Sequence, residues 1–571
     1  MKRLLKYMRG YYRDSVLSPL FKLCEATLEL IVPLIIAGII DTGIKNGDGS
    51  YIFSRFLILV FLGALGLVFS VVAQYFAARA SSGYAKQLRF GLFSHVQQLS
   101  YTELDKIGTS TLITRMSADL NSVRTSLNLA LRLLLRSPFV VFGAMIMAFT
   151  IDVKSALIFA LVIFLLAIVV YGIMLISMPL HKRTQLKLDE VVLATKENLE
   201  GVRVLRAFSK EETERERFSK RVFDLEGAQK RVGRISALLN PLTFIIINLG
   251  LVYLIYTGAL RVDAGELTTG QVVALYNYMS QILVELIKLA NLVVTITKAL
   301  ASQKRIFAVL DIETEGELGD GELEFKTNTA IEFKEVSFKY AGAKENSLSG
   351  VSFKIPRGGT LGIIGATGSG KSTLISLIPA LYEPTGGEIF IDSKNIKEYK
   401  REALNEKIAV VFQNLTLFSG TIRENLCLGK KATDEELWRA LSLAAADGIV
   451  RDKGGLDAVI TEGGKNLSGG QKQRLTIARA LVMNPDILIL DDATSALDYK
   501  TDLEVRRGIK NFKENLTTVI VSQRPSSIMD ADLILTLEDG EISGAGTHEK
   551  LLTSSEVYRE IYESQMGGND E

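Results

Sequence analysis

Six long apolar stretches constrain the fold of this chain more than any other feature of its sequence. They lie near residues 17–42, 54–79, 128–151, 155–178, 237–260 and 271–297. Each reaches or exceeds the ~20 residues that an α-helix needs to cross a bilayer. The sequence therefore predicts a membrane domain of six helices within residues 17–300.

The loops between these stretches alternate in length and charge. Loops near 41–51, 152–154 and 261–269 are short and poor in Lys and Arg, whereas 80–127 and 179–236 are long and rich in them. Cationic loops are retained in the cytoplasm. Both termini and the two long loops are therefore predicted to lie on the cytoplasmic side of the plasma (inner) membrane.

The two long loops are predicted to extend the membrane helices, because apolar residues recur at helical spacing in 186–199 and 218–232. Their tips, 105–121 and 197–211, interrupt this pattern with glycine and polar residues. Each tip is compatible with a short transverse helix that docks on another domain, and equally with a solvated turn.

The segments outside the membrane helices have different compositions. Residues 1–16 form a basic amphipathic pattern typical of an elbow helix in a lipid interface, with a disordered basic tail as the alternative. Residues 301–330 are predicted to be a linker, and 331–571 a soluble domain. The 66 Lys and Arg nearly balance the 64 Asp and Glu, so charge gives no reason to expect a nucleic-acid partner.

A phosphate-binding loop opens the chemistry of the soluble domain. Residues 365–373 read GATGSGKST, between an apolar strand at Thr360–Ile364 and an apolar helix at Leu374–Leu381. In this setting backbone N–H groups surround phosphate oxygens, Lys371 reaches the β- and γ-phosphates, and the Ser372 hydroxyl faces Mg²⁺. The residues expected to bind ATP here are Gly365, Thr367, Gly368, Ser369, Gly370, Lys371, Ser372 and Thr373.

Two further motifs accompany this loop. The apolar run 487–490 is followed by Asp491 and Asp492. This pattern is typical of a buried parallel strand whose end places acidic residues beside the phosphate-binding edge of a sheet. We expect Asp491 to hold Mg²⁺ and Asp492 to act on the attacking water. The sequence LSGGQ at 467–471 precedes a predicted helix at Lys472–Met483, whose N-terminus favours an anion.

With LSGGQ between the other two motifs, the chain resembles the ATP-binding cassette (ABC) exporters. The implied fold is a six-helix transmembrane α domain followed by an α/β P-loop nucleotide-binding domain. The resemblance implies that Tyr340 stacks on adenine, that Gln413 joins Ser372 and Asp491 around Mg²⁺, and that the two tips are coupling helices. It also implies that LSGGQ completes the ATP site of a second cassette, so that this chain is half a transporter. The residues assigned to the partner's ATP are Leu467, Ser468, Gly469, Gly470, Gln471 and Asp498.

Two positions depart from the pattern of a hydrolytically competent member of that family. The residue after the first acid is usually Glu and here is Asp492, and the usual switch-loop His is Gln523. A carboxylate set back by ~1 Å holds water poorly, and Gln523 lacks an imidazolium charge. The pattern resembles the degenerate-site subunit of bacterial heterodimeric multidrug exporters, although tolerated drift in a homodimer is the alternative.

Three acidic residues lie within the apolar stretches. Ionisable groups at membrane depth usually face a cavity or a partner. Glu25, Glu29 and Glu285 are therefore expected either to attract a cationic amphiphile or to pair with Lys22, Lys288, Arg132 or Arg136.

The expected function is that of an ATP-hydrolysing translocase subunit that exports drug-like or lipid-like amphiphiles, with slow hydrolysis at its own site. It would pair with a different half-transporter. The alternatives are a homodimeric lipid or peptide exporter and an ATP-gated channel or regulator.

Overall fold

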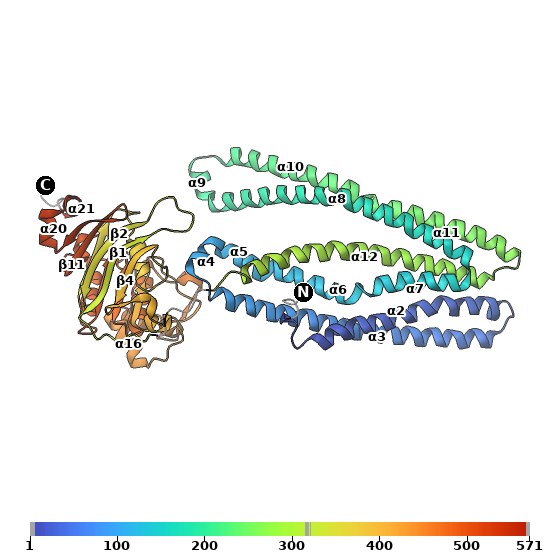
Figure 1. The fold of residues 1–571 in the computed structure, drawn as a ribbon, viewed down its shortest axis with the longest axis horizontal. Coiled ribbons are helices and arrows are strands. Elements are labelled where there is room, and N and C mark those ends of the chain that lie inside the picture. The colour runs from blue at the N-terminus through green and yellow to red at the C-terminus, as the bar shows by residue number, and fades with distance from the viewer. Residues whose placement is uncertain (1–5, 315–318, 320, 567–571) are drawn as a thin grey trace. The chain divides into compact units, whose positions relative to one another are not determined.

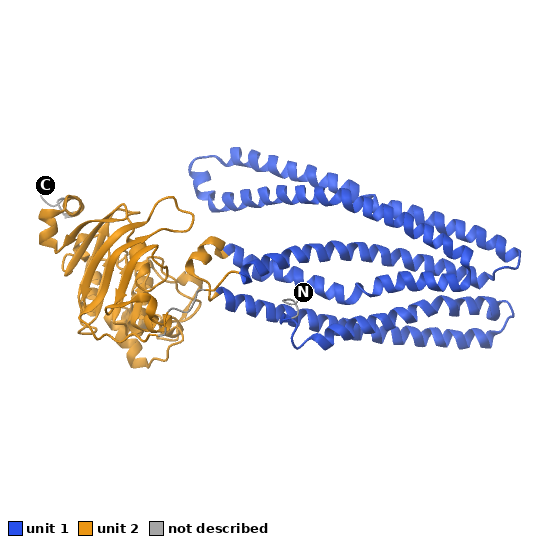
Figure 2. Ribbon diagram, viewed as in Figure 1, with its two compact units in different colours: residues 1–96, 110–311 blue, residues 97–109, 312–571 orange. Residues whose placement is uncertain are grey.

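A computed structural model of the chain describes residues 6–314, 319 and 321–566. They form two compact units (Figure 2). Unit 1 comprises the chain up to Val96 together with Ser110–Asp311, and unit 2 comprises Gln97–Thr109 together with the chain from Ile312 onward. The short segment 97–109 therefore interrupts unit 1 in sequence but belongs to unit 2 in space.

Unit 1 is built from long helices that run side by side (Figure 1). Its helices are α2 (Tyr12–Gly38), η1 (Ile39–Ile44), α3 (Gly49–Val96), η2 (Arg115–Asp119), α6 (Leu120–Leu133), α7 (Arg136–Ile151), α8 (Val153–Glu200), α9 (Val202–Ala207), α10 (Glu211–Ala237), α11 (Leu239–Asp263) and α12 (Thr269–Leu310). Within the described residues, six helical stretches are long and apolar enough to cross a membrane: Tyr12–Ile44, Gly49–Val96, Thr109–Ile151, Val153–Glu200, Glu211–Asp263 and Thr269–Leu310. The six predicted membrane helices are thus confirmed.

Several of these helices are far longer than a bilayer is thick. α3 and α8 each have 48 residues, which at 1.5 Å per residue gives about 72 Å. The hydrocarbon core is only about 30 Å thick. The long loops expected between the spans are therefore largely helical continuations, and the extended parts of α8 and α10 run along each other (Figure 1).

Polar caps fix the short connections at the opposite ends of the helices. Asp152 caps α8 by accepting a hydrogen bond from the Ser155 backbone N–H (2.6 Å) and forms an ion pair with Arg261 (2.5 Å). Asp41 accepts hydrogen bonds from the Thr268 hydroxyl (2.6 Å) and the Gly270 backbone N–H (2.8 Å). These bonds satisfy helix N-termini and tie together hairpins that are distant in sequence.

The predicted elbow helix at 1–16 falls partly on residues 1–5, which lie outside the described part of the chain. A turn spans Met8–Gly10, where Gly10 has a φ of +92°, and α2 begins at Tyr12. Residues 12–16 therefore start the first membrane helix. The first ten residues of the predicted linker, 301–310, are the end of α12.

Short helices are present at both loop tips. α4 (Tyr101–Ile107) is capped by Ser100 and ends at Gly108, whose φ is +76°, and α5 (Thr109–Thr114) follows. α9 occupies the second tip. α4 begins earlier than the predicted 105–121, because its start is set by the Ser100 cap and its end by the glycine.

Three sheets are present in the described part of unit 2. The antiparallel sheet has the order β2 (Leu348–Pro356), β1 (Thr329–Phe338), β4 (Gly386–Ile391), β5 (Lys394–Asn395). The larger sheet has the order β12 (Glu541–Gly546), β11 (Leu533–Glu538), β3 (Thr360–Gly365), β10 (Thr517–Val521), β9 (Ile487–Asp491), β6 (Ile408–Val411). All its neighbouring pairs are parallel except β11 with β12. β7 (Gly420–Thr421) pairs with β8 (Val459–Ile460).

Helices surround these sheets (Figure 1). They are α13 (Lys371–Leu377), η3 (Ile396–Glu398), α14 (Arg401–Lys407), α15 (Ile422–Cys427), α16 (Asp434–Leu443), α17 (Asp447–Asp452), η4 (Glu462–Gly464), α18 (Gly469–Val482), α19 (Tyr499–Lys510), η5 (Pro525–Ser527), α20 (His548–Ser554) and α21 (Glu556–Met566). β9 is buried throughout. Ile487 and Ile489 join one apolar core and Leu488 and Leu490 another, so both faces of the parallel sheet are covered.

Candidate nucleotide site

The candidate site lies where four neighbouring parallel strands end. β3 leads into the phosphate loop, β10 into Gln523, β9 into Asp491 and Asp492, and β6 into Gln413. The carboxyl edge of a parallel sheet is where open α/β folds bind ligands. A cavity of about 300 Å³ opens at this edge. Its lining residues are Tyr340, Ser347, Thr367, Gly368, Gly370, Lys371, Ser372, Thr373, Gln413, Asp491, Asp492, Val521, Ser522 and Gln523.

The backbone of the phosphate loop needs glycine at two positions in particular. A Cβ on Gly365 would lie 2.2 Å from the Leu537 carbonyl oxygen, and one on Gly370 would lie 2.6 Å from the Ser347 carbonyl oxygen. Both residues have φ in the left-handed range. The loop can therefore close tightly ahead of α13, whose first residue is Lys371.

Lys371 is buried at the centre of the loop. Its Nζ donates hydrogen bonds to the carbonyl oxygens of Gly365 (2.9 Å) and Ala366 (2.6 Å). Burial lowers the pKa of this ammonium. A polyphosphate beside it would stabilise the charged form, as the phosphate-loop motif requires.

Two acids face this lysine. The Ser372 hydroxyl donates to Asp491 Oδ2 at 3.0 Å, and burial raises the pKa of the Asp491 carboxyl. Burial likewise raises the pKa of Asp492. Hydroxyl, carboxylate and amide oxygens are the ligands that Mg²⁺ prefers, and the Gln413 backbone also contacts Asp491.

The residues present therefore fit a magnesium ion. Ser372, Asp491 and Gln413 would hold it, and its charge would neutralise phosphate oxygens. The chain's own groups would bind and orient the nucleotide: Lys371 would pair with phosphates, and Asp492 would accept a hydrogen bond from the attacking water.

Tyr340 borders the same cavity and connects it to α4. Its Oη shares a hydrogen bond with Thr373 Oγ1 (3.2 Å), and its ring packs edge-on against Tyr382 at 5.5 Å. The Tyr382 hydroxyl donates to Asp105 at 2.7 Å, and its ring lies 6.0 Å from that of Tyr101. The contacts of Tyr382 with α4 could not be predicted from the sequence, because Tyr382 belongs to no recognisable motif.

The LSGGQ segment and Asp498 do not line this cavity. Ser468 caps α18 through a reciprocal box with Gln471, and Ser468 and Gly469 are exposed. Asp498 caps α19 by accepting from Thr501. Of the residues predicted for this chain's own ATP site, all line the cavity except Gly365 and Ser369, which belong to the phosphate loop but not to the lining. The predicted partner-site residues lie elsewhere on unit 2.

One supporting residue was also missed from the sequence. Gln473 of α18 is buried, donates to the Asp492 carbonyl (3.4 Å) and accepts from the Ala496 backbone N–H (3.0 Å). It links the signature helix to the backbone that carries the second acid. Its position one turn beyond Gly469 is unremarkable in the sequence.

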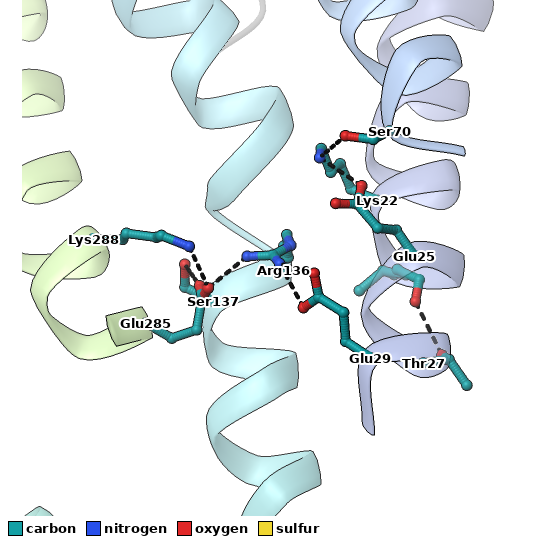
Figure 3. Close-up of polar contacts among 10 residues, drawn as sticks. Lys22, Glu25, Thr27, Glu29, Ser70, Arg136, Ser137, Glu285 and Lys288 are labelled. Atoms are coloured by element: carbon teal, nitrogen blue, oxygen red, sulfur yellow. Dashed lines mark hydrogen bonds and ion pairs between the residues drawn. The ribbon is translucent and has the colours of Figure 1, made fainter. Parts of the chain in front are cut away.

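All three membrane carboxylates form ion pairs within unit 1 (Figure 3). Arg136 pairs with Glu285 (2.5 Å) and with Glu29 (2.7 Å). Lys288 also pairs with Glu285 (2.8 Å), and Lys22 pairs with Glu25 (2.5 Å). Lys22, Lys288 and Arg136 are therefore the partners that the sequence left open, whereas Arg132 has no such pair in the described chain.

Both parts of the chain match models of known protein families. A family model described as "ABC transporter transmembrane region" matches residues 15–286, and one described as "ABC transporter" matches residues 348–495. The chain is 35% identical over 570 residues to the uncharacterized ABC transporter ATP-binding protein YfiB of Bacillus subtilis, covering 99% of each.

Two further comparisons extend the likeness. The chain is 30% identical to the ATP-dependent lipid A-core flippase of Haemophilus ducreyi, over 99% of this chain and 98% of that one. A bacterial Atm1-family ABC exporter with ATP bound has the same fold, with a TM-score of 0.83 at 24% identity, covering 99% of this chain and 100% of that one. Since full-length relatives and both family models agree with the fold and the site, this chain belongs to the ABC transporter family.

Proposed function

We propose that this chain is one half of an ATP-driven exporter with both termini and unit 2 in the cytoplasm. Its own site binds ATP with Mg²⁺ and hydrolyses it slowly. Its LSGGQ segment completes the active site of a different half-transporter, where most hydrolysis takes place.

The observation that carries this proposal is the separation of the two half-sites on unit 2. Lys371, Asp491 and Asp492 gather around one cavity, while Ser468 and Gly469 are exposed outside it. α18 begins at Gly469, and the partial positive charge of a helix N-terminus favours phosphate. A second cassette would supply the nucleotide that this surface lacks.

The asymmetry rests on the side chains at two strand ends. Asp492 follows β9 with a carboxylate one methylene shorter than the Glu usual in the family, and Gln523 follows β10 with no ionisable group. Both face the cavity of this chain's own site. LSGGQ is intact. The departures therefore weaken only the site built on this chain's phosphate loop.

An amphiphile with a cationic group is the proposed cargo. Of the three membrane carboxylates, Glu29 is the accessible one, with 43% of its side chain exposed against 12% for Glu25 and 4% for Glu285. A half-exposed carboxylate among membrane helices favours a cavity rather than lipid. Glu29 also pairs with Arg136, so we assign only its exposed side to cargo contact. Glu25 and Glu285 hold the neighbouring cations.

Purification of the tagged chain from the cells that make it tests this proposal. The expected result is a complex with a second six-helix protein that carries Glu and His at the positions matching Asp492 and Gln523. The complex should turn over ATP faster than the chain alone. A homodimer with vigorous, transport-coupled turnover would contradict the proposal.

A homodimeric lipid exporter is the second candidate, because relatives with full-length similarity are lipid A-core flippases. It predicts that the chain alone forms dimers whose ATP turnover rises with added lipid. Absence of both properties would remove this candidate.

A further inference from the structure

A basic groove lies between the segment Lys6–Arg9 and the part of α3 beyond its apolar run. It encloses about 1150 Å³ and is completed by residues of η2 and α6. Five cations line it: Lys6, Arg9, Lys86, Arg89 and Arg124. No acidic residue of the described chain is among its lining residues.

The lining of the groove brings the five cations together with no negative charge among the described residues that form it. Among the described residues, none of them forms an ion pair with a carboxylate. Like charges gathered in one concave surface repel one another and raise the local concentration of anions. An anionic ligand is therefore the chemical complement of the groove.

The N-terminal segment packs closely against one face of α3 beside the groove. Gly83, Gln87 and Gly91 recur every four residues and so lie on one face of α3. The Tyr11 ring covers Gly83, where a Cβ would lie 2.2 Å from its Cζ, and the Tyr7 ring covers Gly91, where a Cβ would lie 2.7 Å from its Cε1. Gln87 donates to the Arg9 carbonyl at 2.7 Å. These contacts hold the cations of the first segment opposite those of α3.

Exposed aromatic rings in the same lining favour a lipid over a free anion. Phe90 and Phe93 are 73% and 52% exposed, and both line the groove with Tyr7. Basic residues mixed with aromatic rings just beyond an apolar membrane run are typical of the headgroup layer. A soluble anion would leave these rings in water.

We propose that this groove binds the phosphate headgroup of an anionic phospholipid. Lys86, Arg89 and Arg124 contact the phosphate from α3 and α6, and Lys6 and Arg9 close over it from the N-terminal segment. The inference does not depend on the proposed cargo or on the identity of the partner.

Native mass spectrometry of the full-length protein tests the site. Phosphatidylglycerol, phosphatidylcholine and glycerol 3-phosphate are the three probes. The unaltered protein should retain phosphatidylglycerol at least tenfold better than the other two. The triple variant K86Q/R89Q/R124Q should bind phosphatidylglycerol about tenfold or more weakly, because each Lys or Arg near an anionic lipid adds to the electrostatic attraction.

A matched control is available on exposed helix surfaces of the same unit. K182Q/R183Q/R203Q removes the same charge from α8 and α9, outside the groove. It should bind phosphatidylglycerol as the unaltered protein does. If both triple variants lost the same affinity for phosphatidylglycerol, the attraction would be non-specific. If glycerol 3-phosphate bound the unaltered protein as well as phosphatidylglycerol does, the groove would be a site for soluble anions. Either result overturns the proposal.

A second variant keeps the proposal testable if the first triple variant does not fold. K6Q/R9Q changes only exposed residues of the N-terminal segment and should weaken phosphatidylglycerol binding severalfold. Unchanged binding in this variant would overturn the proposal. The proposal would also be overturned if a partner protein covered the groove in a complex free of lipid.

Discussion

At the residue scale, Asp492 and Gln523 are the two side chains of this chain's own site that depart from the usual family pattern. Restoring the usual family residues in D492E/Q523H should raise ATP turnover by the purified chain by roughly 10- to 100-fold, because a carboxylate moved by ~1 Å can change a rate that much. Phosphate release under single-turnover conditions measures the effect. D492N/Q523H, which keeps the shorter side chain and removes the charge, should show no gain.

An unaltered chain that already hydrolyses ATP as fast as D492E/Q523H would show that the two departures have no catalytic consequence. In that case the homodimer would become the better interpretation.

Arg136 is the residue on which the membrane charge cluster depends. R136M would leave the buried Glu285 with Lys288 and Ser137 as its remaining partners, so the expected loss lies below the ~3–5 kcal/mol of a buried charge left with no partner. We expect a lower thermal unfolding midpoint for the purified protein. R136M/E285Q should recover much of the loss, because the buried charge is removed as well.

K187M provides the control for this substitution. Lys187 pairs with Glu190 on α8, but both side chains are well exposed, so little change is expected. If R136M destabilised the protein no more than K187M, Arg136 would not be a structural centre of the cluster.

At the scale of elements, α4 is held on unit 2 by Tyr382. Burial raises the pKa of the Tyr382 phenol, and the hydrogen bond to Asp105 raises it further. The hydroxyl therefore remains a donor at physiological pH. Y382F should weaken this contact by about 1 kcal/mol, as expected for a hydrogen bond to an exposed acceptor. Faster amide exchange across residues 97–109 is the expected result.

Y399F is the matched control for Y382F. Tyr399 donates a hydrogen bond of the same length, 2.7 Å, to the Ile391 carbonyl, in a part of unit 2 without α4. Exchange across 97–109 should stay unchanged in Y399F. Equal exchange in both variants would argue against Tyr382 as the anchor of α4.

At the scale of the whole molecule, the two half-sites of unit 2 should contribute unequally to turnover. In the complex with the partner, S468R should reduce ATP hydrolysis roughly 100-fold, since it removes a phosphate-binding contact from the active site. D492A should have a much smaller effect. A steady-state ATPase assay on both variants would separate the possibilities, because a homodimer requires both substitutions to be severe.

The local chemistry of the site was largely predictable. The phosphate loop, the acids after β9 and the cap of α18 each depend on a few consecutive residues, and the structure places 367, 368, 370–373, 413, 491, 492 and 523 around one cavity. Tyr382 and Gln473 were missed because their roles depend on contacts with segments far away in the sequence.

The sequence by itself determined the number of membrane helices and the nucleotide-binding fold, because the length of an apolar run and the conformational demands of a glycine loop are local properties. Only the tertiary structure decided which charges meet. Arg136 is 107 residues from Glu29 and 149 from Glu285, and Lys6 shares a groove with Arg124. Such pairings follow from how the helices pack, which no single segment encodes.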